Sequence, residues 1–177
     1  MTVAMPSGTA DRYVELDFTA NSVQNGAQVS EFEVFGQAEP NLALNQPVTA
    51  SSSTSGYPAG NADDGNTSSY WEGADGTWPT TLAVNLGSAR TISTVVLDLP
   101  PSGAWSTRTQ TLSVVGSDDD STWTTLAGPA TYTWNPATGN TVSIALPAGT
   151  TDQYVGLDFT ANSVQNGAQV SEFEVFG

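Results

Sequence analysis

Hydrophobic and polar residues alternate in several short stretches of the chain, and this pattern predicts β-strands. The stretches lie at residues 82–86, 95–99, 112–115, 142–146, 155–159 and 173–175. A period of two places hydrophobic side chains on one face of a strand and polar ones on the other. No stretch shows a sustained helical period. Short strands separated by Gly, Pro, Asn and Asp predict an all-β fold, a β-sandwich whose end loops carry the function.

One segment of the sequence occurs twice. Residues 16–36 and 157–177 are identical, and the similarity extends upstream, where residues 2–15 align with residues 143–156. The two copies are offset by 141 positions, and residues 37–177 also number 141. A fixed period is typical of a tandem array. We therefore expect residues 1–36 to be the C-terminal strands of a preceding repeat and residues 37–177 to be a complete domain. The alternative is a natural protein with a duplicated edge.

Composition narrows the possible functions. The chain has 18 acidic and 3 basic residues, a net charge of −15, and neither histidine nor cysteine. Such a negative charge argues against nucleic-acid and anionic-membrane partners. The missing residue types exclude histidine catalysis, thiol chemistry and disulfides. With 17 glycines, 10 prolines and few charges, the composition favours a secreted protein. Because no signal peptide opens the chain, we expect it to be a piece of something larger.

Several motifs follow one another in an order that resembles a known family. They are NLALNQPVTASS at residues 41–52, ADDGN at 62–66, YWE at 70–72, LAVNLG at 82–87 and SEFEVFG at 171–177. Together they resemble the discoidin, or coagulation-factor F5/8 type C, domain, and in particular the bacterial carbohydrate-binding modules of family 32. The resemblance covers residues 41–177. It implies an eight-stranded jelly-roll β-sandwich of the galactose-binding-domain-like type with adjacent termini.

The loop at residues 61–69 is a candidate calcium site. Calcium takes six to eight oxygen ligands, and this loop is rich in Asp, Asn and Ser with a glycine for a tight turn. In the family this loop holds a structural cation together with the start of the last strand. The ligands implied by the resemblance are Asn61, Asp64, Asn66, Ser69, Ser171 and Glu172, with the residues 61 and 171 binding through their carbonyls. The alternative is an acidic surface turn, since Asp-Gly turns are common.

Aromatic residues with neighbouring polar groups are the candidates for a sugar site, because a tryptophan ring stacks on a pyranose and a buried hydroxyl needs partners. Trp71 and Trp134 are expected in the core, and Trp123 as cover for a strand end. Trp105 lies three residues before Arg108, whose five donors suit vicinal hydroxyls. A structural salt bridge is the alternative role for this arginine. Trp78 lies in a glycine-containing loop.

Two further residues come from the resemblance. Glu72 corresponds to an acidic position that galactose-binding members use as a sugar acceptor, and Gln165 stands where relatives carry a stacking aromatic. Galactose-specific members use a histidine, which this chain lacks. A glucan is therefore at least as plausible as a galactoside. A strongly acidic module should also avoid polyanions unless calcium bridges them.

Three functions compete. The leading hypothesis is a non-catalytic carbohydrate-binding module of a secreted bacterial polysaccharide-degrading enzyme, with a neutral glycan as its partner and structural calcium. The rival is a structural or adhesive spacer that binds no glycan. Exposed Trp105 or Trp78 beside Arg108 would favour binding, and burial of both would favour the spacer. Catalysis by a carboxylate pair such as Glu172 and Glu174 is not expected, since the two lie on one strand face where metal binding or solvation explains them.

The duplication predicts self-association. The two copies are nearly the same, so either could complete the sandwich at similar free energy. The N-terminal copy could insert into a second molecule, giving a swapped dimer or a chain of molecules, or into its own domain. The simplest alternative is a disordered or crystal-packed tail.

Overall fold

The structure is a computed structural model that describes residues 3, 13–34 and 39–177. The chain divides into two units, Met1–Gln37 and Ala38–Gly177. All strands and helices assigned within the described residues lie in the second unit. Of the segment predicted to contain strands of a preceding repeat, residues 1–2, 4–12 and 35–36 lie outside the described part of the chain, as do residues 37 and 38 of the predicted domain.

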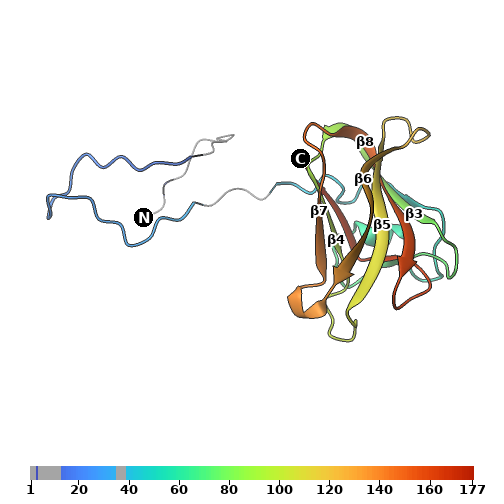
Figure 1. Cartoon of the computed structure of the whole chain (residues 1–177). Helices are drawn as coiled ribbons and strands as arrows, with labels where there is room; N and C mark the ends of the chain where they lie inside the picture. Colours follow the sequence, from blue (N-terminus) through green and yellow to red (C-terminus); the bar gives the residue numbers. More distant parts are fainter. Residues whose placement is uncertain (1–2, 4–12, 35–38) are drawn as a thin grey trace. The chain divides into compact units, whose positions relative to one another are not determined.

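Two antiparallel sheets form the second unit (Figure 1). The larger orders β1 (Val48–Ala50), β3 (Thr80–Thr91), β8 (Thr151–Asn162), β5 (Arg108–Ser117) and β6 (Thr124–Trp134). The smaller orders β10 (Glu172–Phe176), β4 (Thr94–Asp98) and β7 (Thr141–Ala145). A short ladder pairs β2 (Trp71–Glu72) with β9 (Gln169–Val170), and two 3₁₀ turns, η1 (Ala59–Ala62) and η2 (Pro136–Thr138), complete the fold.

The all-β sandwich is confirmed, with a difference in strand number. We expected eight strands, and the described residues contain ten. The two-residue strands β2 and β9 account for the difference, because they are too short to show an alternating pattern. Strand β6 was also hard to recognise. It is an edge strand that contains Pro129 and Gly128, residues which a central strand disfavours.

The core lies between the two sheets. Alternate residues of β3, β5 and β8 face alternate residues of β4, β7 and β10. Trp71 and Trp134 are buried as expected, and each indole N–H donates to a carbonyl, of Ser52 at 3.1 Å and of Leu97 at 3.0 Å. These two bonds satisfy the polar edge of each ring, which makes full burial favourable.

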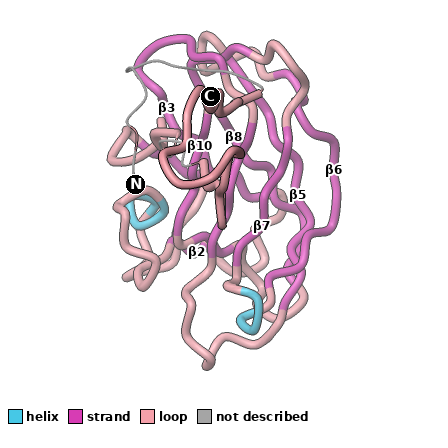
Figure 2. Tube along the Cα trace, turned by 90° about the vertical axis from the view of Figure 1, so that its left-hand side faces the viewer, coloured by secondary structure: helices cyan, strands magenta, loops and turns pink. Residues whose placement is uncertain are grey.

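The two ends of the domain lie side by side. The backbone N–H of Leu42 donates to the carbonyl of Val175 at 2.8 Å, so the first residues of the domain lie beside its last strand. Figure 2 shows the strands as a framework with loops at both ends. The loops before β5 and after β8 emerge at the same end, the lower end in Figure 1.

Candidate functional site

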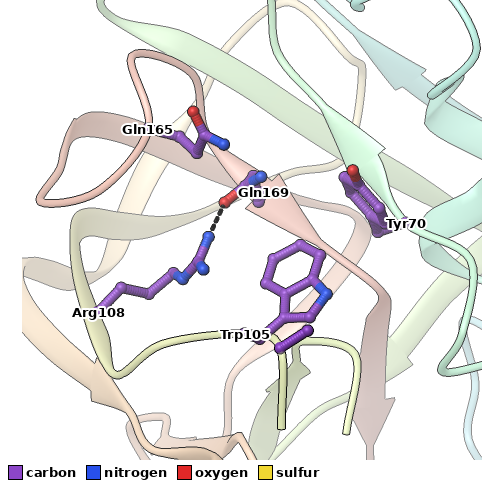
Figure 3. Close-up of a pocket in the computed structure, with 6 residues that line it drawn as sticks. Tyr70, Trp105, Arg108, Gln165 and Gln169 are labelled. Carbon is purple, nitrogen blue, oxygen red and sulfur yellow. Dashed lines mark hydrogen bonds between the residues drawn. The ribbon is translucent and has the colours of Figure 1, made fainter. Parts of the chain in front are cut away.

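A depression of about 230 Å³ lies where these loops meet. Tyr70, Ala104, Trp105, Arg108, Gln165 and Gln169 line it (Figure 3). Three of the five predicted ligand-binding residues, Trp105, Arg108 and Gln165, are therefore brought together. Gln165 lies more than fifty residues after Trp105 and Arg108 in the sequence, so the fold rather than local sequence brings it to this pair.

Trp105 is the central aromatic of the depression and is held on two sides. The guanidinium carbon of Arg108 lies 4.4 Å from the centroid of its ring, a cation–π contact. Tyr70 meets the same ring edge-on at 4.8 Å, and Tyr57 stacks on Tyr70 at 4.4 Å. The backbone N–H of Trp105 donates to the carbonyl of Ser102 at 3.0 Å, which fixes the loop below it. Trp105 is only partly buried, so the ring is fixed in orientation yet still reachable.

Arg108 belongs to a chain of polar groups that ends on Glu72. Its Nη1 donates to Gln169 Oε1 at 2.5 Å, and Gln169 Nε2 donates to Glu72 Oε2 at 2.7 Å. Gln110 fixes the backbone of Gln169 from both sides, at 2.8 and 2.9 Å. Burial lowers the pKa of Arg108, while Glu72 and Tyr70 oppose that shift. Glu72 thus orients the lining amide and is not itself a lining residue.

The alternative of a structural salt bridge at Arg108 is not what the described residues show. Its hydrogen-bond partners are the neutral side chain of Gln169 and the carbonyl of Ser106. Arg108 is only 6% exposed, so most of its donors are already out of water. A buried cation whose acceptors are neutral is still stabilised when further oxygen atoms accept hydrogen bonds from it.

The loop after β8 is pre-formed by its own sequence. The side-chain oxygen of Asn162 accepts from the N–H groups of Val164 and Gln165 at 3.0 and 3.2 Å, and its amide donates to the carbonyl of Gly167 at 3.0 Å. A side chain at Gly167 would overlap the carbonyl of Gly73. The close approach of these two glycines presses the loop against the segment that follows Glu72.

Trp78 lies elsewhere. It is partly buried and packs against the hydrophobic core, and it does not line the depression. Three lining residues were missed at the level of sequence, Tyr70, Ala104 and Gln169. Tyr70 could have been found, because it precedes the core residue Trp71 and the alternation points its side chain the other way. Gln169 carried no signal, since nothing in the sequence places a two-residue strand there.

The predicted calcium loop is well ordered by local bonds. Asp64 accepts from the backbone N–H of Asn66 and from the hydroxyl of Ser69, both at 2.8 Å, and that hydroxyl also reaches the carbonyl of Asn66 at 2.9 Å. Asn61 donates to the carbonyl of Tyr70 at 3.0 Å. Gly65 has φ of +75°, which a glycine adopts without strain.

The last strand brings a second carboxylate to this loop. Glu172 Oε2 accepts from the N–H of Gly65 at 3.3 Å, while Oε1 is buried and has no hydrogen-bond partner. Burial first, and then the charge of Asp64, raise the pKa of Glu172 to about 7. Two carboxylates meeting with an unpartnered oxygen fit a cation between them.

Other groups around this loop add to the oxygen set. The hydroxyl of Ser171 is also buried without a partner, and burial raises the pKa of the neighbouring Asp63 to about 6. Three or more acidic, Cys or His side chains do not cluster at any point of the described residues. A cation here would therefore depend on carbonyls and hydroxyls as well as on Asp64 and Glu172, as the predicted ligand set has it.

Comparison with known proteins identifies the fold. The profile of the F5/8 type C domain matches residues 47–173. The chain belongs to this family. No curated protein sequence matches it. Within the part of the chain that the structure describes, no helix is long and hydrophobic enough to cross a membrane.

Similar solved structures include chitosan-binding modules and a CBM32. Chitosan-binding module 1 of the chitosanase/glucanase from Paenibacillus sp. IK-5 is 31% identical, with a TM-score of 0.61 over 78% of this chain and 99% of that one. Module 2 of the same enzyme, solved with chitotriose, is 30% identical, with a TM-score of 0.61 over 77% and 100%. The CBM32 of AlyQ, solved with 4,5-unsaturated mannuronic acid, is 27% identical, with a TM-score of 0.62 over 75% and 96%.

Proposed function

We propose that this chain contains a non-catalytic carbohydrate-binding module of a secreted polysaccharide-degrading enzyme, which binds a neutral glycan at the end loops. The observation that carries the proposal is Trp105, a partly exposed ring held between Arg108 and Tyr70 in a depression lined by amides. Similar structures solved with chitotriose and with 4,5-unsaturated mannuronic acid support the carbohydrate-binding part of it.

The lining suits a sugar. The face of a pyranose carries C–H groups that pack on an aromatic ring, and its hydroxyls donate and accept. Trp105 supplies the ring, and Gln165, Gln169 and Arg108 supply donors and acceptors around it. These groups are fixed by Asn162 and Glu72 before any ligand arrives, which lowers the entropic cost of binding.

The charges of the lining favour a neutral glycan over an amino sugar. The lining residues include one cation and no carboxylate, since Glu72 stands behind Gln169. A polyanionic glycan would be repelled by the net charge of −15 that the chain carries. The second candidate is a cationic polymer such as chitosan, because the same net charge would attract it and two modules at 30% and 31% identity bind chitosan.

Calcium in this proposal is structural. Asp64, Glu172, Ser69 and Asn66, with the carbonyls of Asn61 and Ser171, would hold it. A divalent cation would neutralise the two carboxylates and join the loop to the last strand. It would stabilise the fold by binding only the folded form.

Affinity electrophoresis of the full chain tests the proposal. Gels would contain a soluble β-glucan, an α-glucan, a galactan, chitosan or alginate, each with calcium and with chelator. Retardation by a neutral glycan is the expected result. Retardation by chitosan alone would favour the second candidate. A folded protein that no glycan retards would contradict the proposal and favour the spacer.

A further inference from the structure

The duplicated segment is found in two different environments. In the domain, Leu157, Phe159, Phe173 and Val175 are fully buried, within β8 and β10. Their identical counterparts Leu16, Phe18, Phe32 and Val34 are 44%, 49%, 48% and 62% exposed, and the described residues 13–34 form no strand. The surface that would cover this segment is known, because the second copy shows it. It is the body of an F5/8 type C sandwich.

The segment already carries the loop of its buried copy. Asn21 accepts from Val23 and Gln24 at 3.0 and 3.2 Å and donates to the carbonyl of Gly26 at 2.7 Å. Asn162 makes the same three bonds, 141 positions later. The turn is thus encoded locally, while the strands on either side depend on a sandwich to pair with.

The place that β8 and β10 fill in this domain, here called the slot, is within reach of the N-terminal copy. Leu42 donates to the carbonyl of Val175, whose counterpart is Val34. Seven residues separate Val34 from Leu42 in the sequence, enough to make a turn at the end of the last strand. Reach therefore does not prevent the N-terminal copy from occupying the slot, within its own molecule or in a second one.

The two copies differ at several positions before residue 16, and one of these differences changes how the strand fits in the place of β8. Gly156 of β8 is replaced by Glu15 in the N-terminal copy. A Cβ at Gly156 would lie 2.9 Å from the ring of Trp123 and 2.9 Å from Cγ2 of the buried Val115. Trp123 covers this glycine and meets Tyr154 edge-on at 6.4 Å. Glu15 in this place would displace the tryptophan and bring a carboxylate against an apolar surface.

We propose that Glu15 excludes the N-terminal copy from this domain, and that residues 13–34 bind a related F5/8 type C sandwich with a small side chain in the position of Trp123. Sequence identity from residue 16 onward would otherwise make exchange of the two copies nearly neutral in free energy. One glutamate against one tryptophan decides which copy enters which sandwich, and it protects tandem domains from exchanging strands with one another.

Engineered disulfides test this, because the chain contains no cysteine. Val96 of β4 pairs with Glu174 of β10, whose counterpart is Glu33. The pair V96C and E174C reports the C-terminal copy in the slot. The pair V96C and E33C reports the N-terminal copy, as a monomer or as a cross-linked dimer on a non-reducing gel. In the otherwise native chain we expect cross-linking from residue 174 to exceed that from residue 33 by about tenfold or more.

Exchanging the discriminating residues should reverse the preference. In a chain carrying E15G and G156E, we expect cross-linking from residue 33 to exceed that from residue 174. Trp123→Ala makes this domain resemble the proposed partner, and it should raise cross-linking from residue 33 several-fold even if the exchanged chain folds poorly. Equal cross-linking of the two pairs in the native chain would overturn the proposal. So would a Trp123→Ala variant, folded by circular dichroism, in which cross-linking from residue 33 does not rise.

Discussion

At the scale of single residues, the site depends on how Trp105 is held. Its ring has Arg108 on one side and the edge of Tyr70 on another, and Arg108 is anchored to Gln169. An aromatic ring that is fixed in this way loses little entropy when a sugar stacks on it. Most of the affinity should therefore depend on this one side chain, with the amides setting orientation.

Arg108 should matter for both binding and stability. In Arg108→Ala, the acceptor of Gln169 loses a buried charged donor, which costs about 1–3 kcal/mol of unfolding free energy. Binding of the glycan should weaken in the same variant. Urea denaturation and affinity electrophoresis would measure the two effects. The matched control is Arg90→Ala, which removes the same charge from an exposed position of β3 and should change neither.

Glu172 should respond to calcium, whereas its neighbour Glu174 should not. The raised pKa of Glu172 means that the folded state holds its proton more tightly than the unfolded state does. Stability from this group is therefore present at acidic pH and is lost as pH rises through about 7. In chelator at alkaline pH, Glu172→Gln should melt at a higher temperature than the native chain.

Calcium should invert that order. Saturating calcium, at about a hundred times its dissociation constant, would stabilise the native chain by about 2.7 kcal/mol and leave Glu172→Gln unchanged. Glu174→Gln is the control, because it removes a partly buried carboxylate from the same strand and should keep the response to calcium. Thermal melts with and without calcium measure this. An unchanged response in Glu172→Gln would count against the site.

At the scale of elements, two loops must meet for the site to exist. Asn162 shapes the loop after β8, and the contact between Gly167 and Gly73 seats it. Gly167→Ala would force these backbones apart and should cost about 1–3 kcal/mol of stability while weakening glycan binding. Gly103→Ala, in the loop before β5, has open space around it and should affect stability little. Calorimetry of folding and of binding would compare the two.

The sequence was informative where a pattern is repeated and uninformative where a contact is made by the fold alone. Alternation predicted β3, β4, β5, β7, β8 and β10, because each has one face in the core. It did not predict β9, whose two residues pair only because β2 lies beside them. Gln169 was missed for the same reason.

The placement of the predicted site residues shows the same limit. Trp105 and Arg108 could be paired from their spacing, and Gln165 from the family resemblance. Trp78 does not line the depression, although its loop contacts the loop after β8 through the bond from the N–H of Gly76 to the carbonyl of Asn166. A part for Trp78 in ligand binding stays a prediction. Glu72 was placed near the site, although as the support of Gln169 rather than as a lining residue.

At the scale of the whole molecule, the charge of −15 should leave binding to a neutral glycan unaffected by salt. Exposed charges are screened over about 10 Å at 0.1 M salt, so an attraction that depends on net charge weakens as salt is added. We expect constant affinity for the neutral glycan between about 0.05 and 0.5 M sodium chloride. Titration calorimetry at several salt concentrations measures it. A steep loss of affinity with salt would indicate a cationic ligand instead.

The central claim is that Trp105 forms a glycan-binding site at one end of the sandwich. Its most direct test is the affinity of the native chain, Trp105→Ala and Trp123→Ala for a soluble neutral glucan and a galactan, measured by titration calorimetry. The account predicts binding that is lost in Trp105→Ala and kept in Trp123→Ala, whose tryptophan covers β8 away from the depression. Equal affinity of the two variants, with both folded, would contradict it.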